Sequence, residues 1–195
     1  MERNLLPNGL RDGRKTHALH GLGGIGKTQL AIAYARKHQV TYSATLWLNG
    51  NSKDTLLQSL AAFGRHAEVS GLSQATATTT QREFQDVEAE AQAVLRWLAL
   101  KENHQWLMII DNVDREHSSD VGDPQAYDIE WFLPPADHGF VLITTRLSSL
   151  SAKVKPTEIG QLNITQALEL LSDRSGLPRS TKGTRNICYC LIKRC

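Results

Sequence analysis

Eight residues from Gly21 to Thr28 constrain the fold of this chain more than any other feature. They read Gly-Leu-Gly-Gly-Ile-Gly-Lys-Thr and match the pattern G-x-x-x-x-G-K-[ST]. A short stretch that suits a strand, residues 16–20, precedes them, and an alanine-rich stretch with helical spacing follows from Leu30. The sequence therefore predicts a strand, a glycine-rich phosphate-binding loop and a helix, in that order.

The residue types in this loop suit a phosphate group. Gly23, Gly24 and Gly26 let the backbone take positive φ and bring its N–H groups close to phosphate oxygens, while the helix N-terminus adds partial positive charge. Lys27 is expected to contact the β and γ phosphates, and the Thr28 hydroxyl to ligate Mg²⁺. The alternative is a glycine turn before Lys-Thr, which the flanking strand and helix patterns disfavour.

Apolar runs and helical spacings alternate along the rest of the chain. Uninterrupted apolar runs are typical of strands covered on both faces, and strands that alternate with helices indicate a parallel sheet with right-handed crossovers. Strands are expected at residues 16–20, 44–49, 106–110, 140–143 and 156–160, and helices after the loop and at residues 54–66, 81–100 and 165–172. The predicted fold class is α/β, a phosphate-loop NTPase three-layer sandwich with a mainly parallel five-stranded sheet.

Two connecting segments have distinct compositions. Residues 69–80 are rich in Ser, Thr, Gly and Ala and are expected to form a mobile loop. Residues 115–137 are acidic, and within them residues 131–133, Trp-Phe-Leu, are expected to anchor the segment to the core.

Asp111 closes the apolar run of residues 106–110. A carboxylate at the carboxyl end of a parallel strand faces the same crevice as the loop, which is the position of a Walker B aspartate that helps to hold Mg²⁺. The alternative is an aspartate that begins a turn. Asn112 follows it, so the adjacent acid that many such ATPases use to polarise water is missing, and Asp114 is only a weak candidate for a catalytic base.

Thr144, Thr145 and Arg146 follow the next apolar run and are expected at the same crevice. A guanidinium binds phosphate oxygens well, so Arg146 can reach a γ-phosphate and distinguish ATP from ADP. The alternative is a solvated arginine that happens to follow a strand.

Charge and cysteine content limit the partners and the compartment. The net charge of +2 is too small to indicate nucleic acid, and the sequence contains no apolar run long enough for a membrane span. Cys188, Cys190 and Cys195 all fall in the last eight residues, which is not a disulfide framework. We expect a cytoplasmic protein without nucleic-acid or membrane partners.

Four segments together resemble the NB-ARC domain of the STAND class of signalling ATPases, in the form found in fungal NOD-like receptors. They are LHGLGGIGKTQLA at residues 19–31, ATLWLN at 44–49, WLMIIDNVD at 106–114 and GFVLITTR at 139–146. The resemblance implies an ATP/ADP switch that is closed with ADP and opens with ATP into oligomers. Such switches trigger immune signalling or regulated cell death.

The resemblance also implies the ligands and their contacts. The cofactors are ADP or ATP with Mg²⁺, and hydrolysis is slow or absent, so the chain is at most a weak ATPase. Further partners implied are a homotypic NB-ARC oligomer or a full-length receptor. The nucleotide would be bound by Gly21, Leu22, Gly23, Gly24, Ile25, Gly26, Lys27, Thr28, Gln29 and Arg146, and Mg²⁺ by Thr28 and Asp111.

The chain departs from the family pattern after the nucleotide-binding core. The family continues into a helical domain with a Gly-Leu-Pro-Leu motif and a winged-helix domain, whereas here Gly-Leu-Pro at residues 176–178 only hints at the first. We expect an N-terminal lead-in at residues 1–15, an NB-ARC domain at 16–175 and a basic, cysteine-containing tail at 176–195 that is disordered or non-native.

Two alternative functions stay open at the level of sequence. The chain is either a switch domain or a truncated fragment that acts, if at all, by binding relatives. A small phosphotransferase is disfavoured because such enzymes close an arginine-bearing lid over the phosphates, and residues 67–80 and 116–137 contain no arginine.

Overall fold

A computed structural model of the chain describes residues 13–67, 80–115, 126–148, 150 and 154–175. Its elements in chain order are β1 (Lys15–His20), α2 (Lys27–Lys37), β2 (Ala44–Asn49), α3 (Lys53–His66), α4 (Thr80–Leu98), β3 (Trp106–Asp111), the 3₁₀ helix η1 (Ile129–Phe132), β4 (Phe140–Thr145), β5 (Lys155–Glu158) and α6 (Ile164–Ser175). The chain divides into two compact units, Met1–Ile159 and Gly160–Cys195. The division falls inside the predicted domain 16–175, whose bounds stay a prediction.

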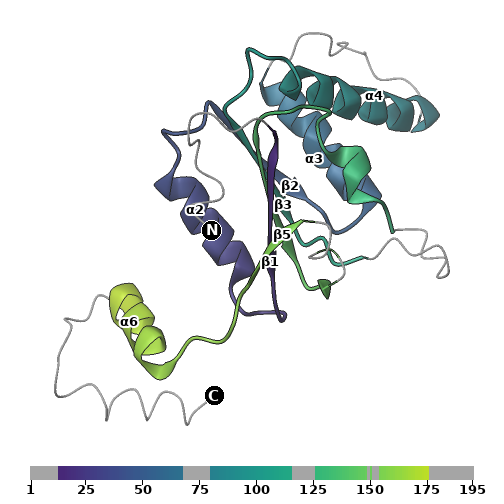
Figure 1. The fold of residues 1–195 in the computed structure, drawn as a ribbon. Helices are drawn as coiled ribbons and strands as arrows, with labels where there is room; N and C mark the ends of the chain where they lie inside the picture. Colours follow the sequence, from purple (N-terminus) through teal and green to yellow (C-terminus); the bar gives the residue numbers. More distant parts are fainter. Residues whose placement is uncertain (1–12, 68–79, 116–125, 149, 151–153, 176–195) are drawn as a thin grey trace. The chain divides into compact units, whose positions relative to one another are not determined.

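The first unit is built on one five-stranded sheet in the order β2-β3-β4-β1-β5 (Figure 1). Every paired strand is parallel to its neighbour, so all the carboxyl ends lie at the same edge. Strand β4 lies between β1, which leads into the glycine loop, and β3, which ends at Asp111. The chain that follows β4 is therefore placed between the loop and Asp111.

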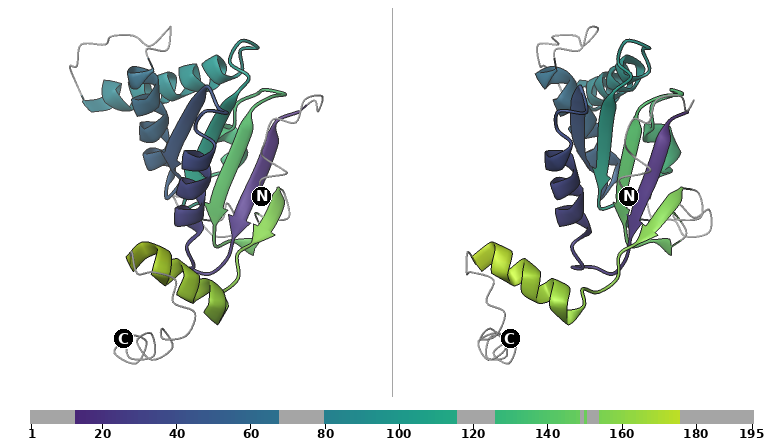
Figure 2. Two further views of the ribbon diagram at one scale, coloured as in Figure 1. Left: turned by 90° about the vertical axis from the view of Figure 1, so that its left-hand side faces the viewer. Right: turned by 60° about the vertical axis from the view of Figure 1, so that its left-hand side comes forward.

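The sheet is the middle of three layers, with α2 on one face and α3 and α4 on the other (Figure 2). The two faces divide the side chains of β3, because successive residues of a strand point in opposite directions. Met108 and Ile110 join the cluster formed with α3 and α4, whereas Leu107 and Ile109 join the cluster formed with α2. All four are fully buried, which explains why β3 is an uninterrupted apolar run.

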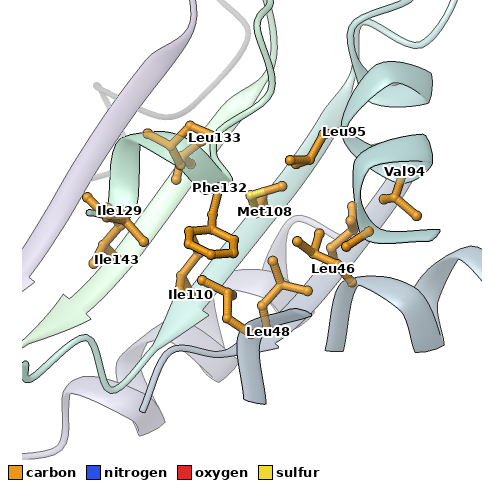
Figure 3. Packing of buried hydrophobic residues seen from close by; sticks show 14 of the residues in the cluster. Leu46, Leu48, Val94, Leu95, Met108, Ile110, Ile129, Phe132, Leu133 and Ile143 are labelled. Atoms are coloured by element: carbon orange, nitrogen blue, oxygen red, sulfur yellow. The ribbon is translucent and has the colours of Figure 1, made fainter. Parts of the chain in front are cut away.

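The cluster under α3 and α4, here called the large core, is the greater of the two (Figure 3). Burying a leucine, isoleucine or phenylalanine side chain contributes about 1.5–3 kcal/mol. The large core includes Leu46, Leu48, Leu56, Leu60, Val94, Leu95, Leu98, Trp106, Met108, Ile110, Phe132, Leu133, Val141 and Ile143. The cluster under α2, here called the small core, consists of Leu19, Ala31, Tyr34, Tyr42, Leu107, Ile109, Phe140 and Leu142.

The structure confirms the predicted fold class and places all five strands and all four helices within a few residues of their expected bounds. The anchor at residues 131–133 is confirmed for Phe132 and Leu133, which are buried, and is wrong for Trp131, whose side chain is 77% exposed. The 3₁₀ turn of η1 explains the difference, because its three residues per turn point adjacent side chains about 120° apart.

Some sequence expectations fall outside the described residues: the loop at 69–80 except its last residue, the tail at 176–195, and most of the lead-in at 1–15. Within the part of the chain that the structure describes, no helix combines the length and the apolar character needed to cross a bilayer.

Candidate functional site

The loop after β1 presents backbone N–H groups at the start of α2. Gly24 and Gly26 take φ of 75° and 99°, the left-handed region that favours glycine, and an added Cβ at either would meet open space. Gly26 is the N-cap residue of α2, so no side chain caps the helix, and its first turn carries no acidic residue. The free N–H groups and the helix dipole therefore make this loop a favourable place for an anion.

Lys27 lies directly under the loop. Its side chain is buried, and Nζ donates to the carbonyl oxygens of Gly21 at 2.8 Å and Leu22 at 2.9 Å. Burial lowers the pKa of Lys27, and the nearby charges of Asp114, Arg146 and Asp111 act on it as well. A cation held by two carbonyls inside a loop of N–H groups is suited to bind the oxygens of a phosphate.

Thr28 and Asp111 come together as the sequence predicts. The Thr28 hydroxyl donates to Oδ1 of Asp111 at 2.9 Å, and Thr144, at the end of β4, donates to the same oxygen at 2.6 Å. Asp111 is buried beneath these contacts. A hydroxyl and a carboxylate at hydrogen-bond distance from one another are the oxygen donors that Mg²⁺ uses beside a phosphate.

Thr144 has a positioning role that sequence reasoning missed. Its hydroxyl accepts a hydrogen bond from the backbone N of Asn112 at 2.9 Å while it donates to Asp111, and its carbonyl accepts from the backbone N of Val113 at 2.9 Å. These bonds fix the turn after β3, where Asn112 has a φ of 66°. The sequence placed Thr144 at this crevice, but it carries no local signal for the strand order that sets β4 beside β3.

Arg146 and Asp114 form an ion pair at this edge of the sheet. The guanidinium Nε lies 3.0 Å from Oδ2 of Asp114, and the backbone N of Arg146 donates to Oδ1 at 2.7 Å. Both oxygens of the candidate catalytic base are thus engaged by one arginine. The base role of Asp114 stays a prediction, as does the phosphate contact of Arg146.

The other predicted loop residues differ in exposure. The side chains of Leu22 and Gln29 are exposed, while Ile25 is half-buried against Gly21. At Gly21 an added Cβ would lie 2.7 Å from the carbonyl oxygen of Ile159, so close packing requires glycine there. Leu22 and Gln29 contribute to a phosphate site through their backbone groups in this arrangement.

A second group of contacts ties the end of β2 to the site and was not predicted. The backbone N of Gly50 donates to the carbonyl oxygen of Asp111 at 2.7 Å, and the hydroxyl of Tyr127 donates to the carbonyl oxygen of Gly50. Arg115 donates from Nε to the carbonyl oxygen of Asn51 at 2.9 Å. No local pattern reveals these contacts, because Tyr127 and Gly50 lie 77 residues apart.

The residues present fit a nucleotide phosphate with Mg²⁺. The loop supplies N–H groups and a lysine for phosphate oxygens, and Thr28 and Asp111 supply two oxygen ligands for the metal. The described residues contain no cluster of three or more His, Cys, Asp or Glu side chains that would hold a metal alone. Mg²⁺ usually takes only one or two protein ligands and completes its shell with phosphates and water, so two ligands suffice.

The fold and the loop define the class of this chain: an α/β domain with the fold of the phosphate-loop NTPases. No family model matches the sequence, and no curated protein matches it. Among solved structures, 23 chains match.

One matching structure is the crystal structure of Cdc6p from Pyrobaculum aerophilum, with a TM-score of 0.54 and 12% sequence identity over 90% of this chain and 46% of that chain. Another is the structure of Drosophila ORC bound to GC-rich DNA and Cdc6, with a TM-score of 0.44 and 14% identity over 93% of this chain and 63% of that chain. The chain spans less than half the length of Cdc6p, and at this identity the likeness concerns the fold.

Proposed function

We propose that this chain carries a nucleotide-binding switch domain of the NB-ARC type, which binds ADP or ATP with Mg²⁺ and hydrolyses ATP slowly or not at all. The observation that carries the proposal is the meeting of Lys27, Thr28 and Asp111 at one edge of the sheet. The four motif segments that resemble NB-ARC contain the end of β1 with the loop and the start of α2, and all of β2, β3 and β4. The proposed domain covers residues 16–175.

The switch works through contacts that only the triphosphate makes. A ligand biases two conformations only by its difference in affinity for them, and the γ-phosphate adds bonds to Lys27, Arg146 and Mg²⁺ that ADP cannot make. The Mg²⁺ would be held by Thr28 and Asp111 and would neutralise charge on the phosphates. The proposed partners are an adenine nucleotide and other NB-ARC chains, in a cytoplasmic setting.

The groups beside Asp111 support the proposal of slow or absent hydrolysis. Asn112 carries an amide, which does not take up a proton at neutral pH, and its backbone is held by Thr144. Asp114 is paired through both oxygens with Arg146. Neither is arranged to activate water while these contacts persist.

Calorimetric titration with ADP and with ATP, each with Mg²⁺, tests the proposal. We expect the wild-type chain to bind both and Lys27→Ala to lose at least about a hundredfold in affinity, because a charged partner of the phosphates is removed. Lys101→Ala is the matched control, since Lys101 is exposed and precedes β3 at the opposite edge of the sheet. A folded wild-type chain that binds neither nucleotide would contradict the switch and favour an interaction fragment.

A further inference from the structure

The pair between Asp114 and Arg146 is more specific than an ordinary surface ion pair. The carboxylate accepts from the backbone N and from Nε of the same arginine, at 2.7 and 3.0 Å. The Arg146 side chain is 63% exposed and that of Asp114 is 23% exposed. An exposed ion pair alone contributes little to stability. Here the same carboxylate also accepts from the backbone N, so it holds both the backbone and the side chain of one arginine in place.

The arginine held in this way lies against the glycine loop. An added Cβ at Gly23 would come within 3.1 Å of Cζ and 3.3 Å of Nη1 of Arg146. Gly24 and Gly26 take positive φ as expected, whereas Gly23 does not, so the expectation of positive φ was wrong for Gly23. A side chain at this position would therefore push the guanidinium away by a few tenths of an ångström, which places Arg146 in direct contact range of the loop.

We propose that Asp114 is a positioning residue that holds Arg146 against Gly23, beside the phosphate loop, and thereby sets the preference for ATP over ADP. The inference rests on the proposed nucleotide function. A long, flexible side chain loses rotamer freedom when a ligand orders it, and a side chain that is already ordered avoids that loss. A preorganised cation therefore binds a terminal phosphate more tightly than a freely moving one.

The electrostatics of Lys27 agree with this arrangement. Asp114 raises and Arg146 lowers the pKa of Lys27, in addition to the larger effect of burial, so the three charges act on one another. The carboxylate also offsets the repulsion between the two cations. Asp114 thus allows two positive groups to remain close to the place where a phosphate would bind.

The test is the ratio of ATP to ADP affinity in Asp114→Asn, measured by calorimetry with Mg²⁺. We expect ATP affinity to fall about five- to thirtyfold, the range that corresponds to ordering one long side chain, while ADP affinity stays within about twofold. If Asp114 instead competes with phosphate for Arg146, its neutralisation leaves ATP binding unchanged or tighter, and the inference is wrong. Asp137→Asn is the matched control, because Asp137 is 86% exposed and precedes β4 at the opposite edge.

A second measurement needs no nucleotide and separates this inference from the proposed function. In the wild-type chain we expect nuclear magnetic resonance relaxation to show the Nε–H of Arg146 as ordered, and in Asp114→Asn and Gly23→Ala as mobile or displaced. An Nε–H that is equally mobile in all three chains would overturn the positioning role. A chain with an ordered Arg146 that binds neither nucleotide would contradict the proposed function alone.

Discussion

The two faces of the sheet are stabilised to different degrees and carry different chemistry. The large core under α3 and α4 is built almost entirely from apolar side chains, including Leu60 and Trp106. The small core under α2 adjoins the buried polar groups of Lys27, Asp111 and Thr144. The difference indicates that the face under α3 and α4 contributes most of the stability, whereas the face under α2 carries a charged site at the carboxyl edge of the sheet. Mutations on the two faces should therefore separate stability from binding.

The largest effect on stability is expected in the large core. Leu60 is fully buried on α3, and Leu60→Ala should lower the free energy of unfolding by about 2–5 kcal/mol, because it removes buried carbon and leaves a cavity. Denaturant unfolding measures the change, and Leu100→Ala, at an exposed residue, is the control. If the folded Leu60→Ala chain also loses nucleotide affinity by more than about threefold, the two faces do not separate stability from binding.

The converse variant is expected to affect binding more than stability. Thr144→Val keeps the shape of the side chain but removes the donor to Asp111 and the acceptor for the backbone N of Asn112. Loss of a partner that orients a metal ligand typically costs about 10–100-fold in metal affinity. Titration of ATP at a series of Mg²⁺ concentrations should show weaker ATP binding by the variant at the lowest Mg²⁺ concentrations. If the variant requires no more Mg²⁺ than the wild type, Thr144 has no role in the site.

A smaller effect is expected from pH. Because burial lowers the pKa of Lys27, this side chain loses its charge at a lower pH than an ordinary lysine, whose pKa is 10.5. Phosphate affinity should therefore fall as pH rises through the lowered pKa, and the protein should take up a proton on binding nucleotide in that range. Lys27→Arg stays charged and should give a flat profile, so a fall of equal size in that variant would assign the effect to another group.

The sequence was informative wherever a local pattern carries the information. Apolar runs placed β3 and β4, and the glycine pattern placed the loop, because burial on both faces and positive φ leave their mark on adjacent residues. Asp111 and Arg146 were expected at one edge, since parallel strands end together.

Contacts between distant segments were not predictable in this way. The contact of Thr144 with Asp111 depends on β4 lying beside β3, and strand order is set by packing across the whole sheet. The pairing of Asp114 with Arg146 likewise joins residues 32 apart, and hydrophobic spacing does not encode which polar groups will meet. Trp131 was misplaced because an apolar side chain in a short 3₁₀ turn need not face the core.

The central claim is that the carboxyl edge of the sheet binds the phosphates of a nucleotide, and chemical-shift mapping tests it most directly. Addition of ADP with Mg²⁺ to the ¹⁵N-labelled chain should shift the backbone amides of residues 21–29, 111–114 and 144–146. The amides of residues 99–105, which precede β3 at the opposite edge, should stay in place. Shifts confined to the opposite edge, or no shifts at saturating nucleotide, would contradict the account.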